Sequence, residues 1–305
     1  MKIRFVYFEG DAEQAKKNGT EDKGEITIYI DGGFDLTHLG HYNALRQCSV
    51  MSDYLVLGVN SDADLMKTKG PTVMNCKERC EIMKHCKFVQ HIEPETDYTP
   101  TFELLDKFGC QFYAHGDDPC IDADGVDICE RFRSKDRFKL FKRTEGVSTT
   151  EITGRILALA QYNILKEQDP AQAKEFLDAK LKEAPKQKFL STSRRIVNFA
   201  NTNTPKEGDT IVYIQGSFDL LHHGHLKRLE EAKKLGDFLY VGLWDDEMTR
   251  YYKGGMLPII SVQERLLMLL SQKHVDDVVI GAPFVITEDL IKSLNINKVV
   301  QIINT

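Results

Sequence analysis

The sequence predicts an α/β protein made of two tandem domains, each a parallel sheet with helices on both faces. Two observations lead to this fold class. An internal repeat spans most of the 305 residues, and each copy alternates apolar, strand-like runs with amphipathic, helix-like segments. Strands of near-continuous hydrophobicity are typical of parallel sheets that are covered on both faces.

The repeat is clearest at two strand-like segments that continue into histidines. Residues 26–41 read ITIYIDGGFDLTHLGH and residues 210–225 read TIVYIQGSFDLLHHGH, with nine of the sixteen positions identical. The offset is 210 − 26 = 184, and it also aligns residues 53–59 with 237–243. Similarity over this length indicates a duplicated domain.

The elements of each copy follow from this alternation. The strands expected in the first copy are 26–30, 54–59, 110–114 and, with a less regular pattern, 87–92. The helices expected there are 40–50, 77–86, 101–108 and 151–165. The strands expected in the second copy are 210–214, 238–243, 277–280 and 297–303.

These elements divide the chain into a first domain at residues 1–165, a linker at 166–209 and a second domain at 210–305. The linker is polar and poor in strand signals. Residues 171–181 have a helical pattern, and residues 202–208 read as a loop before the next strand.

The composition narrows the class of protein. A net charge of −6 gives no global basic field that would draw the chain to nucleic acid or to an anionic membrane. The chain contains no apolar run long enough to cross a bilayer, and its start lacks the order of a secretory signal. We therefore expect a cytoplasmic protein, with peripheral contact to membranes left open.

The cysteines agree with that compartment. There are seven, all in the first half and without regular spacing, which favours reduced thiols over a disulfide framework. Cys76, Cys80, His85 and Cys86 are close in sequence, but no C-x-x-C pair is present, and helical cysteines are commonly small buried hydrophobes. No metal site is assigned from the sequence.

The glycine-rich turn after the first strand carries the strongest chemical signal. Because it opens a helix, a phosphate can meet free backbone N–H groups and the positive end of the helix dipole. Gly32 and Gly33 permit close approach of the backbone, and Gly40 leaves room between two histidines. His38 and His41 lie on one face of the turn and can donate hydrogen bonds to phosphate oxygens. The structural alternative is that one of these histidines caps the helix and the other belongs to the core. A long pattern that occurs twice in the chain favours phosphate binding.

A second segment, residues 143–150, reads RTEGVSTT. Ser148 and Glu151 fit a capping box at the start of a helix, which is the purely structural explanation. Arg143 just upstream adds a planar, charged donor that suits phosphate.

Two further loops are candidates for nucleotide contacts. Lys69 follows the second strand and matches Lys253 of the second copy, although an isolated loop lysine is usually solvated. His115 and Gly116 end a strand at the edge where open α/β sheets place their ligands. Arg79, on the helix after the lysine loop, could equally be a structural ion-pair residue.

The pattern G-x-F-D-x-x-H-x-G-H resembles the signature of the cytidylyltransferase family, within the broader H-x-G-H nucleotidyltransferases. RTEGVSTT resembles that family's second signature, R-T-x-G-[IV]-S-T-[ST]. The resemblance covers roughly residues 25–305 and implies tandem Rossmann-like nucleotidyltransferase domains. Two such halves in one chain are typical of the members that use phosphoethanolamine.

The resemblance implies transfer of a cytidylyl group from CTP to phosphoethanolamine, giving CDP-ethanolamine and pyrophosphate for phosphatidylethanolamine synthesis. Both partners are small molecules, and Mg²⁺ is expected with CTP because crowded triphosphate oxygens need a hard cation. The catalytic residues that it implies are His38, His41, Lys69 and Arg143. The nucleotide-binding residues that it implies are Gly32, Gly33, Phe34, Asp35, Gly40, His115, Gly116, Thr144, Gly146, Ser148, Thr149 and Thr150.

The substrate amine is harder to place. A primary ammonium needs hydrogen-bond acceptors, whereas a quaternary ammonium favours an aromatic cage, and the single tryptophan, Trp244, is in the second half. Tyr98 and Asp117 are weak candidates for the amine. Asp35 is expected to organise the site rather than to bind Mg²⁺. Phosphocholine or glycerol phosphate as substrate, and a non-catalytic CTP-binding sensor, stay open as alternatives.

The second copy departs from the family pattern. It keeps the remnant residues Asp219, His222, His225 and Lys253. Gln301 and Ile302 stand where the first copy has His115 and Gly116, and no counterpart of residues 143–150 follows, as if the chain were short or trimmed. We expect the first half to carry catalysis and the second to support or regulate it.

Overall fold

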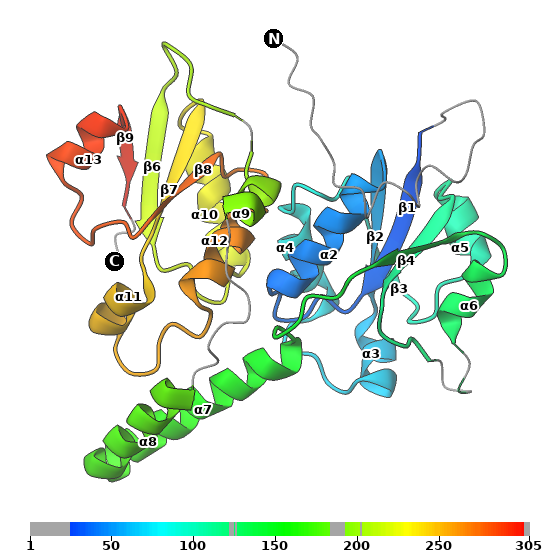
Figure 1. The fold of residues 1–305 in the computed structure, drawn as a ribbon, viewed down its shortest axis with the longest axis horizontal. Coiled ribbons are helices and arrows are strands. Elements are labelled where there is room, and N and C mark those ends of the chain that lie inside the picture. Colours follow the sequence, from blue (N-terminus) through cyan, green and yellow to red (C-terminus); the bar gives the residue numbers. More distant parts are fainter. Residues whose placement is uncertain (1–24, 122–124, 126, 184–192, 202, 302–305) are drawn as a thin grey trace.

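The computed structural model describes residues 25–121, 125, 127–183, 193–201 and 203–301. Two parallel sheets, one from each half of the sequence, are flanked by helices, and the predicted fold class is confirmed (Figure 1). Among the described residues, no helix has both the length and the apolar character of a membrane span.

The first sheet has the strand order β3-β2-β1-β4-β5 and is parallel throughout. Its strands are β1 (Thr27–Gly32), β2 (Tyr54–Asn60), β3 (His91–Thr96), β4 (Phe112–Gly116) and β5 (Phe138–Phe141). The helices around it are α2 (Leu39–Val50), α3 (Asp62–Thr68), α4 (Cys76–Lys84), α5 (Phe102–Lys107) and α6 (Ile128–Arg133).

The second sheet repeats this arrangement in the order β8-β7-β6-β9. Its strands are β6 (Ile211–Gly216), β7 (Phe238–Leu243), β8 (Asp277–Ile280) and β9 (Lys298–Val300). Its helices are α10 (His223–Lys233), α11 (Asp246–Lys253), α12 (Val262–Leu270) and α13 (Glu288–Ser293). Thr27 lies opposite Tyr54, and Ile211 opposite Phe238, so the register of the central pair is the same at an offset of 184 (211 − 27, 238 − 54).

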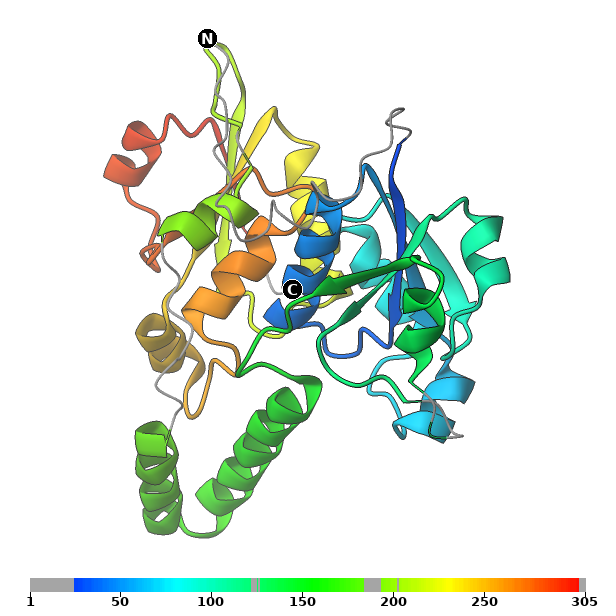
Figure 2. The same cartoon turned by 45° about the vertical axis from the view of Figure 1, so that its right-hand side comes forward.

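Three helices connect the sheets. They are α7 (Thr149–Gln168), α8 (Pro170–Glu183) and α9 (Ser193–Phe199). α7 and α8 form a helical hairpin that projects away from both sheets (Figures 1 and 2). The helix predicted at 171–181 is confirmed within α8, and residues 203–208 form the predicted loop, with Thr202 outside the described residues.

The strand predicted at 87–92 is wrong, because β3 begins only at His91. The preceding residues lie at the boundary with the second half, where the backbone N–H of Lys87 donates to the carbonyl of Ser271 at 2.9 Å. Val89 is buried there in the core shared with the second half. The apolar run thus serves an interface rather than a strand. β5, α3 and α6 were not predicted because they are short, and residues 302–303 of the predicted last strand lie outside the described residues.

The two halves face each other through equivalent helices. α2 and α4 pack against α12 and α10, between the two sheets (Figures 1 and 2). Cys86 and Gln272 form an antiparallel bridge, and their offset of 186 (272 − 86) equals that of Arg79 and Arg265 (265 − 79). Equivalent positions therefore meet, so the halves are related by an approximate two-fold axis, and their apolar side chains form one continuous core.

Two buried arginines fix the loops at the carboxyl ends of the strands. The fully buried guanidinium of Arg79 donates to the carbonyl of Asn60 at 2.8 Å and to the carbonyl of Gly33, and it pairs with Asp62 at 2.6 Å. Arg265 repeats this pattern in the second half. A buried charge with these partners has a structural role, so the structural alternative for Arg79 is the one its contacts support.

Candidate active site

The site is built on the turn between β1 and α2. Phe34 and Leu36 adopt left-handed backbone conformations, with φ of 51° and 42°, and Phe218 and Leu220 repeat them at 47° and 48°. Such values are uncommon for residues other than glycine and persist where the surrounding structure enforces them. Both copies therefore keep the same strained turn.

Asp35 holds this turn against the loop that follows Lys69. Its Oδ1 accepts the backbone N–H groups of Leu36 and Met74, both at 3.0 Å, and its Oδ2 accepts that of Val73 at 2.7 Å. Both oxygens are thus engaged by backbone, which suits an organising role and leaves this carboxylate poorly placed to bind a metal ion directly.

The two histidines of the first half form a capping box. The Nδ1 of His38 accepts the backbone N–H of Gly40 at 3.1 Å, and the Nδ1 of His41 accepts that of His38 at 3.4 Å. Their rings stack with centroids 3.9 Å apart, and the ring of Phe34 lies 5.2 Å from that of His41. Because Nδ1 accepts in both rings, each neutral imidazole carries its proton on Nε2.

Burial keeps both imidazoles neutral. Burial, together with the positive charges of Arg143 and Arg155, lowers the pKa of His38 to about 4. Burial, then the neighbouring His38, Lys69 and Arg143, holds the pKa of His41 well below its ordinary value. Near neutral pH the pair therefore offers two oriented Nε2–H donors, the arrangement that stabilises developing charge on phosphate oxygens.

The glycines of the turn are needed for space. A Cβ added at Gly40 would lie 2.9 Å from two ring atoms of His38, closer than side chains tolerate. Added Cβ atoms at Gly32 and Gly33 would lie 3.2 Å from the ring of Phe34 and 3.3 Å from Leu65. Gly40 is thus the position where a methyl group would displace a histidine.

The second signature docks onto the first. Thr144 is buried, and its hydroxyl accepts from the side-chain amide of Asn43 on α2 at 2.9 Å. Ser148 is the N-cap of α7, accepting the backbone N–H of Glu151 at 3.1 Å, and the hydroxyl of Thr149 lies 3.4 Å from the carbonyl of Asp35. Residues 143–150 are therefore held beside the histidine turn. Gly146 has a φ of 74°, and Thr150 is exposed.

The capping box predicted for Ser148 and Glu151 is only half present. The carboxylate of Glu151 does not return to the cap but pairs with Arg155, one turn along α7, at 2.7 Å. Arg155 also donates to Ile259 O at 3.1 Å and lies 3.3 Å from the carboxylate of Glu264. The guanidinium thus draws Glu151 into a contact with the second half.

Arg143 is half-exposed and pairs with Asp118 at 2.6 Å. Asp117, predicted to bind the substrate amine, is exposed, and its Oδ1 accepts the backbone N–H of Arg143 at 2.9 Å. Its contacts are those of a residue that supports the Arg143 loop.

Lys69 and Tyr98 lie together at the same edge. Lys69 caps the end of α3, and its Nζ lies 5.3 Å from the ring centroid of Tyr98. Among the described residues its ammonium has no hydrogen bond or ion pair with protein, while its charge acts on both His41 and Asp31. Lys69 is thus an exposed cation, placed to act on both groups, that could meet a phosphate.

Asp31 is a site residue that the sequence analysis missed. It lies at the carboxyl end of β1; its Oδ1 accepts the hydroxyl of Tyr113 at 3.0 Å, and its Oδ2 is buried without a partner among the described residues. Burial raises its pKa to about 7, against the opposing effects of Tyr113 and His115. One feature of the sequence could have pointed to Asp31: the equivalent position of the second copy is Gln215.

His115 and Gly116 end β4 beside this carboxylate. The Nδ1 of His115 lies 3.1 Å from the carbonyl of Gly116. The pKa of His115 is raised: burial opposes the shift, but contacts with Cys120 and with that carbonyl outweigh it. A second titratable group therefore lies close to Asp31.

Three differences separate the second turn from the first. Gln215 replaces Asp31 and is satisfied, accepting from Tyr213 at 2.9 Å and donating to the carbonyl of Phe284 at 2.7 Å. Lys253 donates to the hydroxyl of Ser217, which replaces Gly33, at 2.6 Å. The Nδ1 of His225 is buried without a partner among the described residues, so its tautomer is not fixed.

The remaining second-half residues keep only the framework of the turn. Asp219 accepts the backbone N–H groups of Ile259 and Ile260, and His222 caps α10. By strand register Gln301 does occupy the position of His115, while Ile302 lies outside the described residues.

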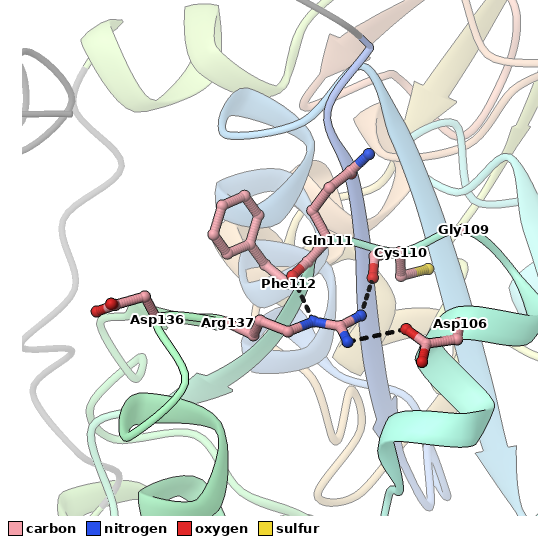
Figure 3. A pocket seen from close by; sticks show the side chains of 7 residues that line it. All are labelled: Asp106, Gly109, Cys110, Gln111, Phe112, Asp136 and Arg137. Carbon is pink, nitrogen blue, oxygen red and sulfur yellow. Dashed lines mark hydrogen bonds and ion pairs between the residues drawn. The ribbon is translucent and has the colours of Figure 1, made fainter. Parts of the chain in front are cut away.

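A separate hollow lies at the opposite edge of the first sheet, at the amino ends of β4 and β5 (Figure 3). There the guanidinium of Arg137 pairs with Asp106 at 2.8 Å and donates to the carbonyls of Cys110 and Gln111 at 2.6 and 3.1 Å. The polar groups that line this hollow bond to one another, so the hollow has a structural role where α5 meets β5.

The cytidylyltransferase-like family matches residues 29–155 and 213–304, that is, both halves. Both sheets, both turns and the segment that carries the second signature fall largely within these ranges. Fold, site and family together define a nucleotidyltransferase of the cytidylyltransferase class.

Individual relatives narrow the class. An ethanolamine-phosphate cytidylyltransferase of Dictyostelium discoideum is 44% identical over 288 residues, covering 92% of this chain and 80% of that protein. One of Mus musculus is 35% identical over 317 residues, covering 95% and 78%. The choline-phosphate cytidylyltransferase 2 of Arabidopsis thaliana is 37% identical, but over 162 residues that cover 52% of this chain. The chain belongs to the ethanolamine-phosphate cytidylyltransferases.

Replacing Gly40 by alanine tests the geometry of the turn. The added methyl group displaces the ring of His38, so we expect kcat/KM for cytidylyl transfer to fall about 100-fold, the loss typical of one misplaced donor. Gly154→Ala, in α7 with open space around it, is the matched control and should keep full activity. Steady-state pyrophosphate release measures both, and an active Gly40→Ala enzyme would contradict the assignment.

Proposed function

We propose that the first half transfers a cytidylyl group from CTP to phosphoethanolamine, releasing pyrophosphate. One arrangement carries the proposal: the β1–α2 turn bears two neutral histidine donors, the end of β1 bears the buried carboxylate of Asp31 with one oxygen unpartnered among the described residues, and the charge of Lys69 acts on both His41 and Asp31. The histidine donors suit a phosphate group, and the carboxylate suits an ammonium group. The names of the relatives that match along most of the chain point to the same substrate.

In the proposed reaction, a phosphate oxygen of phosphoethanolamine attacks the α-phosphorus of CTP. A new P–O bond forms, and the bond from the α-phosphorus to the bridging oxygen of pyrophosphate breaks. A phosphate monoester is already an anionic nucleophile, so alignment and charge stabilisation suffice. His38 and His41 donate Nε2–H to phosphate oxygens, and Lys69 and Arg143 supply positive charge.

The rest of the nucleotide site would come from backbone and loops. Gly32, Gly33 and Gly40 would allow the triphosphate to approach the start of α2, where the backbone N–H groups of His38 and Gly40 bond to the histidine rings and the helix dipole favours negative charge. Ser148 and the residues around it hold the second signature beside this turn. Arg143 would exchange its contact with Asp118 for one with phosphate.

Mg²⁺ would arrive as part of the substrate, bound to the phosphates of CTP. The donor set supports this assignment, because both oxygens of Asp35 accept backbone N–H groups and Asp31 already accepts from Tyr113. Magnesium commonly keeps several water ligands and is held largely by substrate phosphates.

Asp31 would accept the ammonium group of the substrate. A buried carboxylate with a free oxygen is costly without a cation, and a primary ammonium offers both charge and N–H donors. Tyr98, whose ring already lies beside the ammonium of Lys69, would form the neighbouring wall. A trimethylated ammonium has no N–H donor, so this subsite favours ethanolamine.

The second half would not catalyse the reaction. Its lysine is tied to Ser217, its carboxylate is replaced by Gln215, and His225 lacks the bond that fixes its tautomer. Its contribution would be support, through the shared core and the contact of Arg155 with Glu264. The cytoplasm as the compartment stays a prediction.

A substrate comparison tests the proposal. Pyrophosphate release from CTP and Mg²⁺ is measured with phosphoethanolamine, phosphocholine or glycerol phosphate at equal concentrations. We expect phosphoethanolamine to give the highest kcat/KM, by about 100-fold over phosphocholine, since one buried hydrogen-bonded charge pair is at stake. A preference for phosphocholine would overturn the substrate, and binding of CTP without turnover of any of the three would favour a sensor.

Asp31→Asn tests the amine subsite. The folded-state pKa of about 7 lies above the ordinary 3.8, so the carboxylate costs stability that grows as pH rises from about 4 to 7. We therefore expect the variant to melt at a higher temperature than wild type at pH 7 and at a similar temperature below pH 4. Its kcat/KM for phosphoethanolamine should fall about 100-fold.

The pH dependence of KM in the wild type is a second test of the amine subsite. Binding of the ammonium needs the carboxylate form, so KM for phosphoethanolamine should rise as pH falls below about 7 and should be less dependent on pH in Asp31→Asn. A variant with unchanged KM and unchanged melting temperature would show that Asp31 lies outside the subsite.

A further inference from the structure

A cluster of metal-ligating side chains lies between the two halves, and the ring of His223, at the start of α10, lies 6.4 Å from that of His85. His85 caps the end of α4 in the first half and is buried; Glu230 on α10 and His274 before β8 come from the second half and are half-buried. One ligand atom of each residue lies within 4.8 Å of the others. We propose that His85, Glu230 and His274 bind a transition-metal ion, most suitably Zn²⁺, that clamps the two halves together.

The donor set fits this ion. Two imidazoles and one carboxylate are a recurrent three-residue zinc set, which a water molecule completes to four. Ligands about 2.1 Å from a tetrahedral ion are about 3.4 Å apart, and the ligand atoms here lie within 4.8 Å of one another, so the cluster needs to contract by at most about 1.4 Å, which side-chain rotation supplies. Each imidazole would bind the ion through one ring nitrogen in its neutral form.

The backbone already holds the two histidines in place. Lys273, next to His274, donates its backbone N–H to the carbonyl of His85 at 2.8 Å. Next to His85, Cys86 forms the bridge with Gln272. The rings of His85 and His274 lie 5.5 Å apart edge to face. Both ligands are therefore anchored to the same interdomain seam, independent of any ion.

The approximate two-fold axis shows that this arrangement is specific to one side of the interface. The positions equivalent to Glu230 and His274 are Arg46 and Phe88 (230 − 184 = 46, 274 − 186 = 88). There, Phe199 of the linker helix α9 covers the seam, with its ring 6.0 Å from that of Phe88 and 5.3 Å from the guanidinium of Arg46. The linker closes one side, and a metal ion would close the other.

Nearby positive charges limit the affinity of this cluster for a metal ion. Its donor atoms favour a soft or borderline ion over a hard one. Lys234 pairs with Oε1 of Glu230 at 2.7 Å, which leaves one carboxylate oxygen for the ion. The charge of Glu230 acts on both histidines, and the positive charges of Lys234, Lys273 and Lys233 oppose it at His274. Two nitrogen donors beside these charges suit Zn²⁺ or Co²⁺ better than Mg²⁺ or Ca²⁺.

The test is metal binding by the full chain, stripped with a chelator and free of nucleotide. Zn²⁺ is titrated by calorimetry, and Co²⁺ is titrated with its visible absorption as a readout of geometry. We expect one ion per chain in wild type, and at least about 100-fold weaker binding in His85→Ala, His274→Ala and Glu230→Gln. Glu230→Gln changes a half-exposed side chain without altering its shape, so it remains informative if either alanine variant fails to fold.

Two controls separate this site from other zinc ligands. His91→Ala removes one imidazole outside the cluster, and Cys76→Ser removes one of two thiols whose sulfurs lie 3.9 Å apart; both should bind as wild type does. Saturating Zn²⁺ should also raise the melting temperature by about 5 °C in wild type and in these controls, but not in Glu230→Gln. Unchanged binding in Glu230→Gln and His274→Ala, or binding lost in Cys76→Ser, would overturn the proposal.

Discussion

The hydrogen bond from the backbone N–H of His38 to Nδ1 of His41 is the interaction on which the site depends. With the matching bond from Gly40 to His38, it leaves both rings a single neutral tautomer with Nε2–H free. Those hydrogen bonds depend on two contacts that hold the turn in place. Arg79 holds the carbonyl of Gly33, and Asp35 ties the turn to the loop after Lys69. The strained backbone around Phe34 is maintained by these contacts rather than by local preference.

Duplication explains how this site is supported and where it diverged. Both halves keep the buried arginine, the strained turn and the aspartate clamp, because these determine the fold of the turn. They differ at the end of the first strand, where Gln215 replaces Asp31, and at the loop lysine, which among the described residues is bonded to a side chain only in the second half, through Ser217. Arg155 links the helix that follows the second signature to the second half. The second half thus contacts the helix that follows the second signature.

Much of this was predictable, and what was not depends on contacts across the chain. The repeat, the parallel sheets and the histidine turn follow from local sequence, since spacing determines them. Asp31 did not stand out, because its burial and its bond to Tyr113, which is distant in sequence, arise only when the sheet forms. Likewise the run near Val89 reads as a strand until the second half covers it. The grouping of His85 with Glu230 and His274 exists only once the two halves pack together.

The proposed chemistry depends on a turn that presents two neutral imidazoles with their protons on Nε2. Nitrogen-15 NMR of the histidine side chains, followed through a pH titration of the free enzyme, measures tautomer and pKa together. Nε2–H signals are expected for His38 and His41, with the pKa of His38 near 4 and that of His41 well below 6.5. Rings that titrate near the ordinary 6.5, or that carry the proton on Nδ1, would contradict this expectation.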